Sequence, residues 1–261
     1  MTIPLSLARA ARNAVKTAPG ILQNHNARHP ATHPSLRRYE VSALLPNGNI
    51  AETHHVAPAL PIFEDAFCAF SRGSIVETDA GPMAIEDLLP GDKVLDINGD
   101  AQPVLWKGST TLNPGSAHSQ LHNLRLTRLM ADSFGMQRPA TCMIAGPAAR
   151  LLHTPMHLRA IAGNNRILTP VQEFVDGMNV IETAPPTPVE LFHICLQRHS
   201  VIRVGGLEFE TFHPGINAAR NISHAMRSLF LNLFVHIEQL SDFGMPAYPR
   251  AGDGQLDALN A

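Results

Sequence analysis

The stretch Phe67-Cys-Ala-Phe-Ser-Arg-Gly-Ser-Ile-Val76 decides the fold, together with two stretches that follow it at short spacing. These are Ile85-Glu-Asp-Leu-Leu-Pro-Gly-Asp-Lys-Val94 and Gln102-Pro-Val-Leu-Trp-Lys-Gly108. Turn sequences rich in Gly, Asn, Asp and Pro lie between them, at residues 79–82 and 98–100. Short apolar runs separated by such turns are typical of antiparallel strands. The sequence therefore predicts a succession of short strands in this region.

The composition is that of a packed globular protein. The 261 residues are 44% apolar and 16% charged, and 21 prolines and 18 glycines indicate many turns. A net charge of −2 gives no basis for binding nucleic acid or an acidic membrane surface. No apolar run is long enough to predict a membrane span, and the N-terminus lacks the apolar segment of a secretory signal.

The three cysteines, Cys68, Cys142 and Cys195, are an odd number and form no CxxC pair. A disulfide framework is therefore not expected, and a reducing compartment is the simpler assumption. We expect a cytoplasmic protein without a cofactor.

We expect four regions along the chain. A flexible basic arm covers residues 1–36, and a β-domain covers residues 37–215. A C-terminal helix with an extension covers residues 216–250, and a disordered tail covers residues 251–261. The arm carries Arg and Lys but no Asp or Glu. It is interpreted as a solvated tail, with contact to an anionic partner as the alternative.

Two local patterns predict particular elements within the β-domain. Residues 38–56 hold two extended segments around Asn47-Gly48, which predicts a β-hairpin because both turn residues tolerate a positive φ. Residues 167–180 carry apolar residues at helical spacing before Gly177, which predicts a short helix.

The C-terminal region predicts an amphipathic helix of about four turns, with Asn221 or Ser223 as its N-cap. Its apolar residues recur at steps of three and four: Ile222, Met226, Leu229, Phe230, Leu233 and Ile237. The apolar stripe packs back on the β-domain in the favoured interpretation. In the alternative it binds a protein partner or a second copy.

Taken in order, these motifs resemble the Hint module, the self-processing domain of hedgehog proteins and inteins, and especially its bacterial members. The resemblance covers roughly residues 62–215. It implies an all-β fold, a curved, horseshoe-like arrangement of short antiparallel strands with the C-terminal helix packed on it. It also implies autoproteolysis, in which a thiol attacks the preceding carbonyl in an N-to-S acyl shift and a His donates to the scissile nitrogen.

The nucleophile is the first point at which this sequence departs from the family. Bacterial members carry Cys, Phe, two further residues, Gly and then Thr or Ser. Aligning Phe70 and Gly73 with that pattern puts the nucleophile at Ala69, which has no thiol. Cys68 lies one residue too early, and a one-residue slip sends a side chain to the opposite face of a strand. Cys68 is nevertheless the remaining candidate nucleophile.

The catalytic His and the acid/base residue also depart from the family. The family's Ser-Pro-Gln-His-Arg run corresponds to Gly146-Pro-Ala-Ala-Arg150, so Ala149 replaces the His. His153 and His157 follow but occupy other positions. In the later run His193-Ile-Cys-Leu-Gln-Arg-His199, Gln197 stands where the family has Asp. Gln exchanges no proton near pH 7, although His199 is kept.

His193 and Cys195 alternate by two on one predicted strand and share a face, a spacing that is found in metal sites. Two ligands do not make a site, and the sequence offers no second pair. We therefore expect no bound metal.

Two functions follow from these substitutions. The first is a degenerate Hint module that no longer cleaves and acts by protein interaction, through the C-terminal helix. The alternative is an active autoprocessing domain that forms a thioester at Cys68, with His199 as its remaining catalytic group.

Overall fold

The structure, a computed structural model, describes residues 35–113, 125–156, 165–184, 186–218 and 223–251. All of them belong to one compact unit that begins at Ser35. The expected arm and tail therefore lie almost wholly outside the described residues, as do Asn221 and His157.

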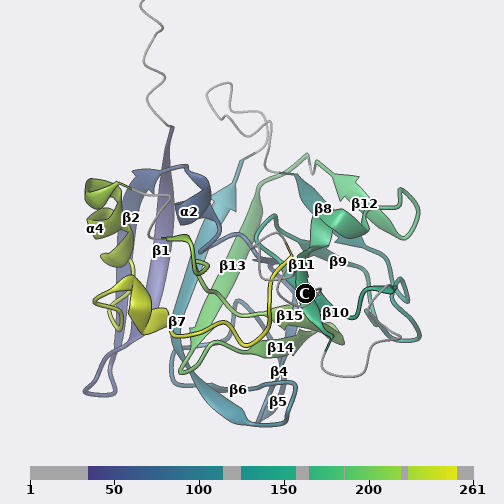
Figure 1. The fold of residues 1–261 in the computed structure, drawn as a ribbon, viewed down its shortest axis with the longest axis horizontal. Coiled ribbons are helices and arrows are strands. Elements are labelled where there is room, and N and C mark those ends of the chain that lie inside the picture. Colours follow the sequence, from purple (N-terminus) through teal and green to yellow (C-terminus); the bar gives the residue numbers. More distant parts are fainter. Residues whose placement is uncertain (1–34, 114–124, 157–164, 185, 219–222, 252–261) are drawn as a thin grey trace, which may run out of the picture. The chain divides into compact units, whose positions relative to one another are not determined.

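The unit consists mainly of antiparallel strands (Figure 1). The strands are β1 (Leu36–Leu44), β2 (Ile50–Pro58), β3 (Phe70–Ser71), β4 (Ile75–Thr78), β5 (Gly81–Ala84), β6 (Lys93–Leu95), β7 (Ala101–Leu112), β8 (Leu126–Leu129), β9 (Met143–Ala145), β10 (Arg150–His153), β11 (Ile167–Pro170), β12 (Val180–Thr183), β13 (Val189–Leu196), β14 (Val201–Val204) and β15 (Leu207–Glu210). The helices are α2 (Pro61–Glu64), η3 (Val171–Phe174), α4 (His224–Leu231) and η4 (Leu240–Phe243).

Strand β7 connects the two parts of the sheet. Its first residues pair with β6, and the remainder pairs with β1 on one side and β13 on the other. The main path of hydrogen-bonded strands runs β11-β10-β15-β14-β4-β6-β7-β13-β3-β9-β8-β12. Strands far apart in sequence are therefore neighbours, and β13 lies between β7 and β3.

The hairpin that the Asn47-Gly48 signal predicts is present. Strands β1 and β2 pair from Leu36 opposite Pro58 to Leu44 opposite Ile50. Gly48 has a φ of 84°, which only glycine adopts without strain. Because β1 also pairs with β7, the hairpin is part of the sheet and not a separate appendage.

Two groups of buried apolar side chains form the interior. The sheet cluster is Ala69, Phe70, Val76, Ile85, Leu88, Val94, Val104, Leu129, Met143, Ala145, Ala149, Leu151, Val171, Val180, Phe192, Ile194, Leu196, Ile202, Val204, Leu207 and Phe209. The hairpin cluster is Tyr39, Val41, Ala43, Ala57, Phe63, Ala66, Phe67, Cys68, Trp106, Leu112, Leu126, Leu191, Cys195, Phe212, Phe230, Leu233, Phe234, Ile237 and Phe243.

The C-terminal helix is present but shorter than the four turns expected. Ser223 is its N-cap, and the Ser223 hydroxyl accepts from the Met226 N–H at 3.3 Å. The helix ends at Leu231, after which Leu233 and Phe234 enter the hairpin cluster from turns. The Trp106 indole N–H donates to the Leu233 carbonyl at 2.7 Å, a bond that holds this segment against β7. In the part of the chain described, none of the helices has the length and apolar character needed to cross a bilayer.

The helix predicted for residues 167–180 is wrong. Residues 167–170 form strand β11, which pairs with β10, and one 3-10 turn, η3, follows. Ile167, Leu168 and Thr169 are all buried, so pairing within the sheet overrides the helical spacing. The backbone then turns at Asp176, whose Oδ1 accepts from the N–H groups of residues 178, 179 and 180 at 2.8–2.9 Å.

Candidate functional site

The position expected for the nucleophile lies just before β3, against β13. Ala69 is fully buried in the sheet cluster. Its N–H donates to the Phe192 carbonyl at 3.1 Å, and its carbonyl accepts from the Gly146 N–H at 2.7 Å. The backbone at this point is therefore held from both sides, by β13 and by the loop that follows β9.

That loop brings the second substituted position to the same place. Ala149 is buried in the sheet cluster, to which Ala69 also belongs, and the loop that carries Ala149 hydrogen-bonds to the backbone of residues 68 and 69. The Ala148 N–H donates to the Cys68 carbonyl at 3.0 Å. A Cβ on Gly146 would lie 2.0 Å from that carbonyl oxygen, so only glycine permits this approach. If the motif alignment holds, the methyl groups of Ala69 and Ala149 stand where the family has a thiol and an imidazole.

The Cys68 side chain lies in a different cluster from Ala69. It belongs to the hairpin cluster, which also holds Phe67 and Trp106, and it is fully buried. Burial raises the pKa of the Cys68 thiol far above its usual range. The thiolate is the nucleophilic form, and the apolar surroundings disfavour it.

His199 lies in a different environment from Cys68. Its Nδ1 accepts from the Ala247 N–H at 2.8 Å, and its Nε2 lies 3.0 Å from Oε1 of Glu210. Because Nδ1 already accepts a hydrogen bond, the lone pair that a general base needs is occupied. Gln197, in the position of the family's Asp, is exposed. Ala69 and Ala149 therefore belong to one buried cluster, whereas Cys68 belongs to the other, and among the described residues no hydrogen bond or ion pair joins Cys68 to His199.

The comparisons with known proteins agree with this architecture. A profile of the family described as Hint domain matches residues 68–216. The chain belongs to the Hint domain family. The resemblance inferred from the sequence motifs is thus confirmed, and so is the all-β Hint-like fold with a C-terminal helix.

Solved structures similar to this Hint domain are inteins and intein-like domains. A bacterial intein-like domain from Clostridium thermocellum matches at 13% identity and a TM-score of 0.39, covering 56% of this chain and 99% of that one. The MchDnaB-1 intein matches at 12% identity and 0.33, covering 55% and 100%. A DnaB intein from Synechocystis sp. PCC 6803 matches at 14% identity and 0.33, covering 55% and 98%. No curated protein matches the chain.

A buried ionic network lies beside the methyl-lined position of the Hint domain, and Glu210 is at its centre. Arg250 Nε donates to both carboxylate oxygens of Glu210, at 2.8 and 3.2 Å, and Arg150 Nε lies 3.7 Å away. Burial alone would raise the pKa of Glu210, but the contacts with His199 and Arg250 outweigh it and hold that pKa at about 2. The carboxylate therefore stays ionised and fully engaged.

The remaining histidines of this region are buried and neutral. His213 accepts from the Gly215 N–H at Nδ1 (2.9 Å), and its Nε2 lies 3.1 Å from the Gly244 carbonyl. The His193 ring packs edge-on against Phe70 and Phe212. Burial lowers the pKa of His213 to about 4 and that of His193 to about 3. Their interactions are those of structural side chains.

Sequence reasoning missed the partner of Glu210. Glu210 lies within the stretch that the family resemblance covers, residues 62–215, but nothing near it in sequence indicates Arg250. Within the described residues, no group of three or more His, Cys, Asp or Glu side chains is arranged to hold a metal ion, and the His193–Cys195 spacing gains no third ligand.

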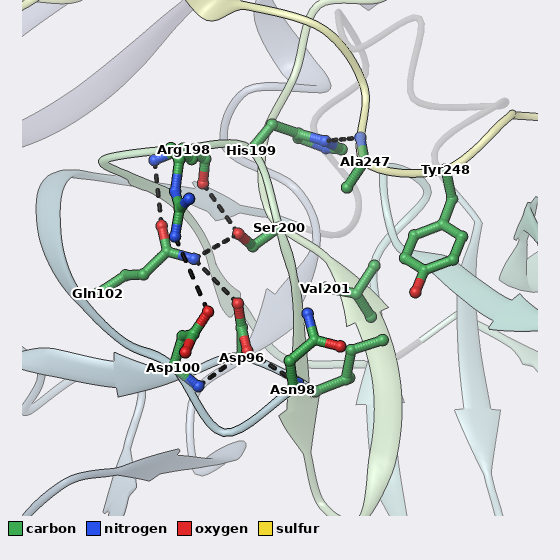
Figure 2. A pocket seen from close by; sticks show the side chains of 11 residues that line it. Asp96, Asn98, Asp100, Gln102, Arg198, His199, Ser200, Val201, Ala247 and Tyr248 are labelled. Carbon is green, nitrogen blue, oxygen red and sulfur yellow. Dashed lines mark hydrogen bonds and ion pairs between the residues drawn. The ribbon is translucent and has the colours of Figure 1, made fainter.

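A small polar cavity of about 210 Å³ lies beside the run that contains Gln197 (Figure 2). Gln102 Nε2 donates to Ser200 Oγ at 2.7 Å and to Asp96 Oδ2 at 3.1 Å, and Gln102 Oε1 accepts from the Arg198 N–H. Asp96, Gln102 and Ser200 are thus bonded to one another on the wall of this cavity. Ser200 Oγ donates to the Arg198 carbonyl at 3.1 Å and contacts no imidazole in Figure 2, so the cavity offers no activated nucleophile.

Proposed function

We propose that this Hint domain has lost self-cleavage and acts as a protein-binding module. The observation that carries the proposal is the peptide bond between Cys68 and Ala69, which is the scissile bond in the family's register. Its carbonyl accepts from Ala148 and its N–H donates to Phe192. The residue that would attack it carries a methyl group, and Ala149 replaces the imidazole that would protonate its nitrogen.

The segment upstream of this bond supports the same conclusion. Strand β1 pairs with β7, and Tyr39, Phe63 and Phe67 are fully buried in the hairpin cluster. In a self-processing protein, cleavage releases what precedes the nucleophile. Here residues 36–67 are an integral part of the sheet and the core, so cleavage would leave the two pieces bound together.

The alternative function is autoprocessing at Cys68, and one observation favours it: a free thiol lies one residue from the expected position, and His199 is retained. The surroundings of both groups argue against it. The thiol is enclosed among apolar side chains and protonated, and the His199 ring contacts Glu210 and Ala247.

Intact mass of the purified chain tests the proposal. During incubation with dithiothreitol or hydroxylamine, the mass should remain that of the 28.3 kDa chain. Cys142→Ala, which removes the exposed thiol, serves as the matched control for Cys68→Ala. Fragments ending at residue 67, lost in Cys68→Ala but retained in Cys142→Ala, would establish the alternative.

The apolar side of α4, which the sequence offered as a binding surface, is already covered within the chain. Phe230 is fully buried in the hairpin cluster, so this side of the helix packs on the β-domain. A partner of α4 would have to contact its outward side.

A further inference from the structure

The outer edge of β2 is an open strand edge. Among the described residues β2 pairs with β1 alone, over nine residues, while its other edge pairs with no strand. Natural edge strands are usually protected by charged side chains, especially lysine, by proline, by a bulge or by a covering helix or loop. Strand β2 reads Ile-Ala-Glu-Thr-His-His-Val-Ala-Pro, with Glu52 as its one acidic residue, no lysine and no proline before its last residue. Its pairing with β1 is also continuous, without a bulge.

The hydrogen bonds of the hairpin determine which residues of β2 point their backbone groups outward. The Leu45 N–H donates to the Asn49 carbonyl, and the Ala59 N–H donates to the Ser35 carbonyl. Both pairs follow the β1–β2 register, so the odd-numbered residues form the hydrogen-bonded pairs with β1. The even-numbered residues Ile50, Glu52, His54 and Val56 therefore present their N–H and C=O groups to the open edge.

The side chains of these four residues are exposed on one face. Ile50 is 41% exposed and Val56 is 63% exposed, and both are large apolar side chains. Glu52 and His54 lie between them and are exposed as well. Along the strand the order is apolar, acid, imidazole, apolar. On an antiparallel copy the same order runs in the opposite direction. Each apolar residue then lies opposite an apolar residue, and Glu52 lies opposite His54.

We infer that β2 pairs antiparallel with β2 of a second copy of this chain, centred on Thr53. Outward backbone groups must face outward backbone groups, so even-numbered residues pair with even-numbered residues. Centring on Thr53 puts Ile50 opposite Val56 and Glu52 opposite His54, and each pair occurs twice. If the pairing were centred on Glu52, the Glu52 carboxylates of the two copies would lie opposite each other, and fewer residues of β2 would pair. The sheet would then continue from one copy into the other, and this pairing does not depend on whether self-cleavage is lost.

A charge-exchange experiment tests the partner and the pairing. By analytical ultracentrifugation, the full chain should form a dimer of twice 28.3 kDa, with its proportion rising with concentration. Glu52→Lys places an ammonium opposite His54, and His54→Glu opposes two carboxylates, so each variant alone should associate at least tenfold more weakly. An equimolar mixture of the two variants should regain the affinity, because the lysine introduced in one copy then faces the glutamate introduced in the other. Glu173→Lys, the same charge change on exposed η3, should leave association unchanged.

A cysteine experiment tests the register. Residues opposite each other in a non-hydrogen-bonded antiparallel pair have Cα atoms about 4.5 Å apart, within the range of about 4.4–6.8 Å for a disulfide. In a Cys142→Ser background, Thr53→Cys should give a disulfide-linked dimer under mild oxidation. Ala51→Cys should not, because its own counterpart lies four residues away along the ladder. A monomer at all concentrations, or equal cross-linking by both variants, would overturn the inference.

Discussion

Ala149 and Arg150 are neighbours in the chain, yet their side chains enter two buried regions of opposite character. Ala149 joins Ala69 in the sheet cluster, where the family keeps its reacting groups. Arg150 reaches toward Glu210, in a network that retains its charges although burial makes them costly. The first region is lined by methyl groups at both positions, and the second holds the charged groups that join the strands to the C-terminal segment. The contrast between the two regions is what the loss of cleavage proposed above predicts.

The largest effect is expected from removing Glu210, the centre of the ionic network. Glu210→Ala should lower the free energy of unfolding by about 3–5 kcal/mol, because the buried Arg250 Nε loses the carboxylate to which it donates. Urea denaturation followed by circular dichroism measures the loss. The exposed pair of Arg125 with Glu182 provides the control, and Glu182→Ala should cost less than about 1 kcal/mol. Equal losses in the two variants would contradict the importance assigned to the network.

Lowering the pH should decrease the free energy of unfolding through the buried histidines near the ionic network. Burial lowers the pKa of His193 to about 3 and that of His213 to about 4, compared with about 6.5 in the unfolded chain. The unfolded state therefore binds more protons between pH 6.5 and pH 4. Stability is fully present above about pH 6.5 and falls as the pH decreases, by on the order of 3 kcal/mol at pH 5. Thermal unfolding from pH 7.5 to pH 5 measures this, and a flat profile would show that these rings titrate normally.

A smaller effect is expected in the sheet cluster, where the loop at residues 146–149 closely approaches the Cys68 carbonyl. Gly146→Ala should cost about 2–3 kcal/mol, since its Cβ meets the Cys68 carbonyl oxygen and either the loop or β3 must move. Gly99→Ala is the matched control: its Cβ meets nothing within 4 Å, and its positive φ should cost about 1 kcal/mol. Amide exchange at Ala148 should accelerate in Gly146→Ala and remain slow in Gly99→Ala.

The smallest effect concerns the remaining thiol. Cys68→Ala leaves a small void in the hairpin cluster and should cost about 1–2 kcal/mol. If Cys68 is a packing residue, Cys68→Val, which keeps an apolar side chain but adds one heavy atom, should cost about 1–2 kcal/mol. A large loss in both variants would indicate a role for the sulfur itself.

Local signals predicted the parts of the fold that local chemistry determines. Gly48 supplies the positive φ that the turn of the hairpin needs, and the Ser223 hydroxyl caps the helix. These parts needed no knowledge of distant contacts.

The predictions from sequence were wrong where contacts between residues far apart in the chain determine the local structure. Leu168 and its neighbours have helical spacing, but β10 on one side and the C-terminal segment on the other make them a strand. Leu233 and Phe234 continue a helical pattern but turn toward Trp106 instead. Arg250 could not be assigned to Glu210, since forty residues separate them and only the path of the chain brings them together.

The same Arg250 has a consequence for biosynthesis. The residues on either side of it hydrogen-bond to Leu168, while its guanidinium neutralises Glu210. During translation, every strand has left the ribosome before this arginine does. In the nascent domain, Glu210 therefore lacks its arginine partner at residue 250 until that residue has emerged, and the contacts that hold β11 and Glu210 to this segment form after the strands themselves.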